Sequence, residues 1–130
     1  MTKQQDFSMW SVNFILFCLA NFLYYGAFYL YIPVLPQYVE MLGGTPADIG
    51  LVGGAFGLSS FIIRPYLGKL ANEWGCKRMM LLGTISFALL FLLFGRVTGV
   101  VPLVVLRLAH GVCLAMYLAA SAAYIADYAP

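Results

Sequence analysis

One uncharged stretch most constrains what this chain can fold into. Residues 7–39 contain no Asp, Glu, Lys or Arg. About 20 consecutive apolar residues suffice for a helix to cross the hydrocarbon core of a bilayer. Lipid offers the backbone no hydrogen-bond partners, so a segment of this kind must satisfy its peptide groups internally, as an α-helix does. The stretch is therefore predicted to be a membrane-spanning helix.

The composition extends this conclusion to the whole chain. Of the 130 residues, 63% are hydrophobic and only 9% are charged, whereas about 25% of the residues in ordinary soluble domains are charged. The fold class predicted is all-α, a polytopic membrane protein. Residues 1–130 form one transmembrane region, and four apolar segments bounded by turn residues predict its helices at about 9–32, 46–67, 78–95 and 102–125.

Several functional classes find no support in the residues. The net charge is +2 with no basic stripe, so no nucleic-acid partner is expected. Cys18, Cys76 and Cys113 lie far apart without metal or redox spacing, and the single His110 has no Cys or carboxylate close in sequence. We expect no metal site, no cofactor and no enzymatic activity.

Basic residues near helix ends predict the orientation, because cytoplasmic loops carry an excess of Lys and Arg. An N-in, C-in chain with four spans places five basic residues on the inner side and two toward the outer side. The inner set is Lys3, Arg64, Lys69, Lys77 and Arg78, and the outer set is Arg96 and Arg107.

Small residues recur on two of the predicted helices at spacings that let helices approach closely. The sets are Gly50, Gly53, Gly54 and Gly57 in the second helix, and Gly111, Ala115, Ala119 and Ala123 in the fourth. Both faces are predicted to pack closely against other helices.

A short, basic, glycine-bounded turn is predicted at 68–78. An ordinary cytoplasmic hairpin would explain its Lys77 and Arg78. The order Gly-x-Leu-Ala-x-x-x-Gly-x-Lys in this place resembles the signature between helices 2 and 3 of the major facilitator superfamily, although Asn72 stands where that family usually has Asp. The resemblance implies a loop that helps lock one facing state, here weakened or differently built, through Gly68, Lys69, Leu70, Ala71, Asn72, Gly75, Lys77 and Arg78.

A second pattern lies around the end of the first helix. Two prolines would end a helix in any protein. Gly26, Pro33, Pro36 and Gly43, with the apolar residues between them, are similar to the helix-1 motif of the drug-efflux branch of the same family.

Arg107, His110 and Gly111 resemble a third family motif, Arg-x-x-Gln-Gly, in which the Arg is thought to serve proton transfer. An Arg inside a span usually faces protein or a water-filled cavity. Alternatively, Arg107 extends its long side chain to the outer interface. His110 is interpreted either as a group that titrates near neutral pH or as a hydrogen-bonded structural residue.

The family lines its central cavity with helices 1 and 4, which makes Asn21 and Tyr25 candidate substrate contacts in addition to the fourth-helix residues. The alternative for each is a hydrogen bond between helices or an aromatic ring facing lipid.

The resemblance implies helices 1–4 of the N-terminal six-helix half of a twelve-helix transporter. Such a protein carries out secondary active transport, here proton-coupled efflux of a small solute by alternating access. Its implied partners are that solute, membrane lipid and the missing C-terminal helices, in the plasma membrane or, in bacteria, the inner membrane. The alternative is a non-transporting four-helix scaffold or assembly subunit. A four-helix multidrug exporter is disfavoured, because it needs a carboxylate in the first helix.

Overall fold

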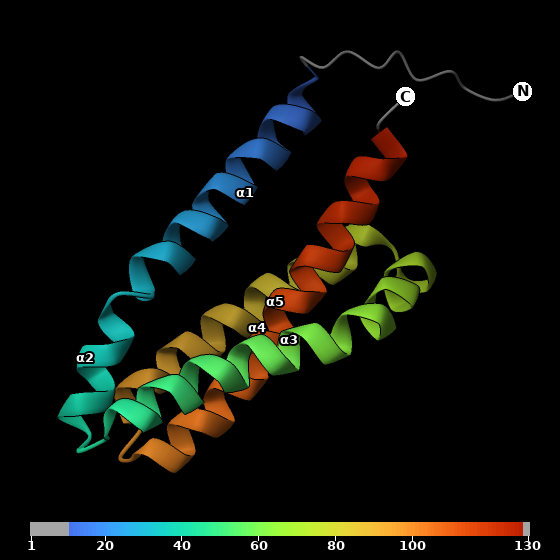
Figure 1. Cartoon of the computed structure of the whole chain (residues 1–130). Helices are drawn as coiled ribbons and strands as arrows, with labels where there is room; N and C mark the ends of the chain where they lie inside the picture. Colours follow the sequence, from blue (N-terminus) through green and yellow to red (C-terminus); the bar gives the residue numbers. More distant parts are fainter. Residues whose placement is uncertain (1–10, 129–130) are drawn as a thin grey trace, which may run out of the picture. The chain divides into compact units, whose positions relative to one another are not determined.

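The computed structural model describes residues 11–128 (Figure 1). Over that range the chain is helical and contains no strand, which confirms the all-α class. Parts of the sequence predictions lie outside the described residues: Lys3, residues 9 and 10 of the first helix, and residues 129–130. The elements are α1 (Val12–Tyr31), α2 (Val34–Met41), α3 (Pro46–Trp74), α4 (Cys76–Leu93), the 3-10 turn η1 (Phe94–Arg96) and α5 (Val100–Tyr128).

The chain divides into two units. The first ends at Val34 and contains α1, and the second begins at Leu35 and contains the remaining helices.

Four segments are long and apolar enough to cross a membrane: Val12–Tyr31, Pro46–Trp74, Cys76–Arg96 and Val100–Asp127. Helices α3 and α5 have 29 residues each, which corresponds to about 43 Å at 1.5 Å per residue. The hydrocarbon core is only about 30 Å thick. Both helices are therefore long enough to carry their ends into the headgroup region.

Two predicted connections are wrong in their secondary structure. The turn predicted at 68–78 is helical except at Gly75, because α3 continues to Trp74 and α4 begins at Cys76. The reason is packing: Leu67 and Ala71 are buried in a core cluster with Met79, so the last turns of α3 gain contacts that a loop would lose. The connection after the first helix is also partly helical, since α2 occupies Val34–Met41.

Prolines and caps account for where the helices begin. Pro36 lies in the first turn of α2, where its missing N–H needs no intrahelical partner. At the start of α3, the Thr45 hydroxyl accepts a hydrogen bond from Asp48 N at 3.4 Å, and Thr45 N donates to Asp48 Oδ2 at 2.7 Å. These reciprocal bonds form a capping box with Pro46 in the first turn.

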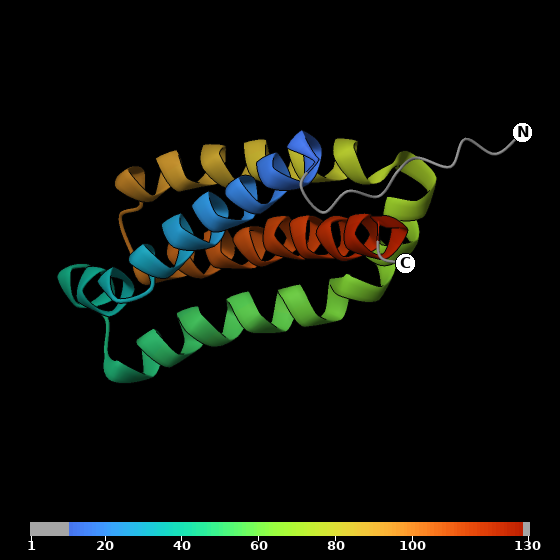
Figure 2. The same cartoon turned by 90° about the horizontal axis from the view of Figure 1, so that it is seen from above.

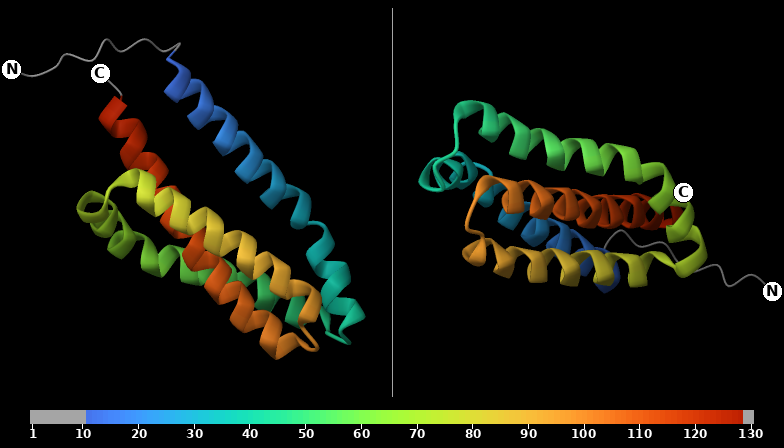
Figure 3. Two further views of the ribbon diagram at one scale, coloured as in Figure 1. Left: turned by 180° about the vertical axis from the view of Figure 1, so that it is seen from behind. Right: turned by 90° about the horizontal axis from the view of Figure 1, so that it is seen from below.

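In the second unit α5 runs between α3 and α4 (Figures 2 and 3). It packs along both neighbours, while α3 and α4 meet mainly near their hairpin. A core cluster joins the three helices through Leu67, Ala71, Met79, Ala115 and Ala120. This arrangement makes α5 the most enclosed of the three helices, so its polar side chains must find partners inside the protein.

The two predicted small-residue faces have different outcomes. Gly111 and Ala115 on α5 are buried, and Gly111 lies against α3. The face on α3 stays a prediction, because within the second unit no atom lies within 4 Å of a Cβ built at Gly50, Gly53, Gly54 or Gly57. These glycines are on a face of α3 that no helix of the second unit covers, because α5 packs on the side that carries Val52, Ala55 and Ser60.

Helix α2 is hydrogen-bonded to η1, which follows the C-terminal end of α4. Leu35 and Val39 are buried, and the Tyr38 hydroxyl donates a hydrogen bond to the carbonyl oxygen of Phe94 in η1. Gly43 takes a positive φ of 79° where the chain turns into α3. This conformation suits glycine, which has no Cβ to clash.

Candidate functional site

The polar residues that the sequence places in the fourth span lie near the middle of α5. Arg107 and His110 are both buried, with 4% and 0% of their surface exposed. They are three residues apart but contact different neighbours, Arg107 on α3 and His110 on α4.

Arg107 faces protein. Its guanidinium carbon lies 4.2 Å from the centroid of the Phe56 ring on α3. A cation over an aromatic face at this distance is attracted by the ring quadrupole, and the attraction strengthens where water is excluded. Of the two alternatives for Arg107, the structure has the buried one, with the side chain turned toward α3.

His110 sits in an aromatic cage formed by α4 and η1. Its ring stacks on Phe87 with centroids 4.4 Å apart and planes at 22°, and the Phe94 ring lies 5.1 Å away. His110 Nε2 is 3.2 Å from the carbonyl oxygen of Phe87. A carbonyl oxygen can only accept, so Nε2 carries the hydrogen. Of the two alternatives for His110, this geometry matches the hydrogen-bonded structural residue.

At Gly111 the backbone of α5 closely approaches α3. A Cβ at this position would meet the carbonyl oxygen of Phe56 and the hydroxyl of Ser59, and would stand 3.2 Å from Ser60 N. Arg107 lies one helical turn before Gly111 on the same face. Arg107 and Gly111 therefore both face the same short segment of α3.

Sequence reasoning missed the aromatic partners of these residues. Phe87, Phe91 and Phe94 follow one another at intervals of four and three, which puts them on one side of a helix. All three rings lie within 6.4 Å of the His110 ring, centroid to centroid. The spacing was a usable signal, although nothing in the sequence pairs that stripe with His110 rather than with lipid.

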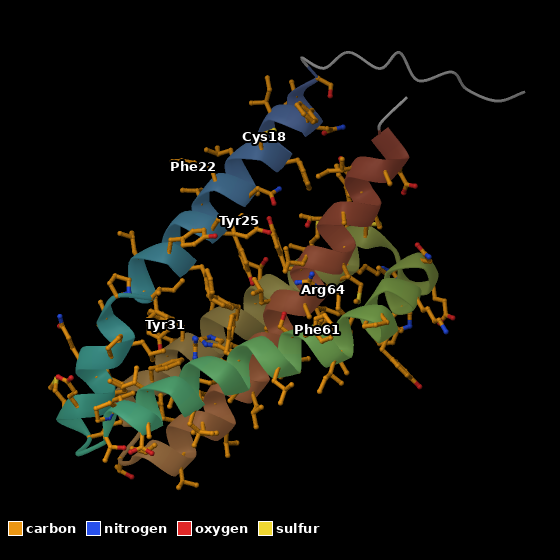
Figure 4. All side chains as sticks on the ribbon, in the orientation of Figure 1. Cys18, Phe22, Tyr25, Tyr31, Phe61 and Arg64 are labelled. Atoms are coloured by element: carbon orange, nitrogen blue, oxygen red, sulfur yellow. The ribbon has the colours of Figure 1, made fainter. Side chains whose placement is uncertain are left out.

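The first-helix candidates belong to the other unit. Asn21 Nδ2 donates to the carbonyl oxygen of Phe17 at 2.9 Å, so its amide bonds to its own helix. Tyr25 meets Tyr24 edge to face at 5.9 Å. Figure 4 labels Tyr25 on α1, and it labels Phe61 and Arg64 on α3.

The helix-1 motif is spread over several elements. Gly26 lies in α1, Pro33 in the connection that follows, Pro36 in α2 and Gly43 in the turn before α3. Gly26 and Pro33 therefore belong to the first unit, and Pro36 and Gly43 belong to the second.

The predicted switch loop is a helical hairpin with a single-residue connection. Gly68, Lys69, Leu70, Ala71 and Asn72 lie in the last turns of α3, Gly75 is the break, and Lys77 and Arg78 lie in the first turn of α4. Gly75 has φ 90° and ψ 138°, a conformation that residues with a Cβ rarely adopt. The N-terminus of a helix disfavours cations, so Lys77 and Arg78 do not stabilise α4 through its dipole.

These features define a polytopic membrane protein with a buried cation in its most enclosed helix. The sequence pattern of the Major Facilitator Superfamily matches residues 17–130. The chain belongs to this family and is a multi-pass protein of the plasma membrane.

Individual relatives agree with the drug-efflux branch. The chain is 34% identical over 98 residues to Multidrug resistance protein 2 of Bacillus subtilis (strain 168). The aligned region covers 75% of this chain and 24% of that protein. The chain is 37% identical over 101 residues to Quinolone resistance protein NorA of Staphylococcus aureus, covering 78% of this chain and 26% of that protein. The chain thus spans about a quarter of the length of the relatives it matches.

Proposed function

We propose that this chain is the N-terminal part of a twelve-helix secondary transporter that exports a small solute by alternating access. In this proposal both ends of the chain face the cytoplasm, α1, α3, α4 and α5 are its first four spans, and protons drive the export. Membership of the Major Facilitator Superfamily and the likeness to two drug resistance proteins support it.

The observation that carries the proposal is the position of Arg107. An arginine in the middle of a span costs about 2.5–3.5 kcal/mol on insertion scales, and such residues mark substrate or ion pathways more often than structural positions. Arg107 is buried over Phe56 in the helix that two others enclose. A span that needed only to cross the bilayer would be more stable with an apolar residue there.

The chemistry of arginine limits what Arg107 does. A guanidinium is not deprotonated in proteins, so Arg107 serves as a fixed positive charge and does not itself release a proton. It lowers the energy of an anion beside it and so favours the ionised form of a neighbouring carboxylate. Proton release from such a carboxylate, or binding of an anionic part of the solute, is the step that Arg107 promotes.

That carboxylate must come from outside the four spans. Within residues 11–128 the acidic side chains stand at or near helix ends, at Glu40, Asp48, Glu73 and Asp127. None of them lies level with Arg107 on a neighbouring helix of the second unit. The missing C-terminal helices are therefore the proposed source of the proton-binding group.

The test uses cells that naturally produce the chain. An antibody to Met1–Ser8 is expected to detect a product several times larger than 14.3 kDa. Chromosomal Arg107→Ala is then expected to raise the accumulation of a quinolone, the solute class named for one relative, to the level of a gene deletion. Arg96→Ala, in η1, is the matched control and should leave accumulation unchanged.

Two results would count against the proposal. A 14.3 kDa product would support the alternative of a four-helix scaffold or assembly subunit. Equal accumulation of the quinolone in the deletion strain and the parent strain would refute the efflux function itself.

A further inference from the structure

We propose that His110 is a positioning residue, which sets the rotation of α5 about its axis and thereby holds Arg107 against α3. The importance of this Arg107 orientation for transport rests on the proposed function. The contacts that fix the orientation lie within the second unit alone. No contact between His110 and a solute or a proton is needed.

The side chains of Arg107 and His110 leave α5 in different directions. Residues three apart on an α-helix differ by about 60° around its axis. Arg107 lies over Phe56 on α3, while His110 points into the rings of Phe87 and Phe94 on the α4 side. If α5 rotated so that His110 left its cage, Arg107 would turn by the same angle away from Phe56.

His110 makes a directional contact with α4. The Nε2 hydrogen bond to the carbonyl oxygen of Phe87 has one preferred line of approach, and the stacked Phe87 ring fixes the plane of the imidazole. Phe87 and His110 are buried, so water cannot replace this bond at low cost. Together the bond and the stacking hold the imidazole in one orientation.

Two other contacts of α5 are made at glycines. Gly111 lies against α3, and Gly83 of α4 lies against the backbone of α5. These contacts set how closely the helices approach, but a glycine has no side chain to resist rotation. Buried apolar side chains of α5 such as Leu103 and Tyr117 also resist rotation, but their packing is not directional. The cage around His110 adds the directional restraint.

The inference is tested by NMR on the 130-residue chain in lipid nanodiscs, with no transport required. The probe is the chemical shift of the Arg107 Nε–H group, which the Phe56 ring current displaces; Phe56→Leu gives the reference position without the ring. His110→Leu fills the cage without a donor, and the Arg107 signal is expected to move toward the Phe56→Leu position. His110→Gln retains a donor and is expected to keep the signal near its original place.

Each outcome bears on the proposal. A folded His110→Leu variant with an unchanged Arg107 signal would overturn it, and so would a His110→Gln signal displaced as far as that of His110→Leu. If His110→Leu does not fold, Phe94→Leu replaces it, because this change loosens the cage while leaving His110 and its hydrogen bond partner in place. That variant should shift the Arg107 signal partway, and no shift would again overturn the proposal. Equal quinolone accumulation in the deletion strain and the parent strain would refute only the proposed function.

Discussion

Gly83 on α4 lies against the backbone of Tyr117 on α5: a Cβ built at Gly83 would stand 3.2 Å from Tyr117 N. The carbonyl oxygen of Cys113 would be equally close, and the Cβ of Met116 would be at 3.4 Å. Two helices in lipid gain little from the hydrophobic effect and associate through close packing of this kind. The Gly83 contact is therefore a main determinant of how α4 is held against α5.

A bulky residue at Gly83 should separate these helices. Gly83→Leu is expected to destabilise the second unit by about 1–3 kcal/mol, the usual range for overpacking. Cys113 is buried while Cys18 and Cys76 are not, so in a Cys18→Ser, Cys76→Ser background a thiol-reactive dye reports unfolding through Cys113. Thermal labelling of Cys113 in detergent should begin at a lower temperature in the variant.

The matched control for Gly83 is Gly53→Leu on α3. A Cβ at Gly53 meets no atom within 4 Å, so this variant should label Cys113 at the temperature of the parent chain. Identical melting of Gly83→Leu and Gly53→Leu would show that the α4–α5 contact contributes nothing to stability.

Gly111 is expected to tolerate even a methyl group poorly. Gly111→Ala places a Cβ against the Phe56 carbonyl oxygen, which is backbone and cannot rotate away. We expect a loss of about 1–3 kcal/mol, despite the higher helix propensity of alanine. Adding Ser59→Ala should restore only part of that loss, since it removes the hydroxyl contact and leaves the carbonyl contact.

Gly57→Ala is the comparison for Gly111→Ala. Position 57 is helical and open, so alanine should be neutral or should stabilise the helix by up to about 1 kcal/mol. A Gly111→Ala chain that melts as high as Gly57→Ala would contradict the close approach of α3 and α5.

Alanine at two glycines of the α3–α4 hairpin should change the free energy of unfolding in opposite directions. Gly75 has a φ of 90°, so Gly75→Ala is expected to cost about 1–3 kcal/mol as backbone strain. Gly68 is inside α3 with nothing within 4 Å of its Cβ position, so Gly68→Ala should be neutral or stabilising. Thermal unfolding followed by circular dichroism in nanodiscs separates the two, and equal effects would mean that the hairpin does not depend on the conformation of Gly75.

The capping box should be measurable at the start of α3. Thr45→Ala removes the acceptor of the Asp48 N–H and is expected to cost about 0.5–2 kcal/mol. Hydrogen exchange should accelerate in the first turn of α3, while Thr45→Ser keeps a hydroxyl and should retain protection. Thr98→Ala, in the connection between η1 and α5, is the surface control, and acceleration of the same amides by that change would argue against a local cap.

The number of membrane spans was predictable because each span carries its own signal: length, apolar composition and the lack of charge. The Thr45 cap was predictable for the same reason, since its partners are three residues apart. The turn at 68–78 was not, because the residues of 68–74 fit a helix or a loop, and only the burial of Ala71 beside Met79 selects the helix. The glycine spacing of α3 marks a close-packing face but does not identify the helix that covers it, and no helix of the second unit does so.

The candidate site shows the same division. The sequence by itself determined a membrane-embedded all-α chain, its family resemblance and the presence of Arg107 and His110 in the fourth span, since these follow from local composition and motif order. Only the tertiary structure decided that Arg107 turns to Phe56 and His110 to Phe87. The physical reason is that a helix fixes the angle between two of its residues, while its rotation against its neighbours depends on packing between segments far apart in the chain.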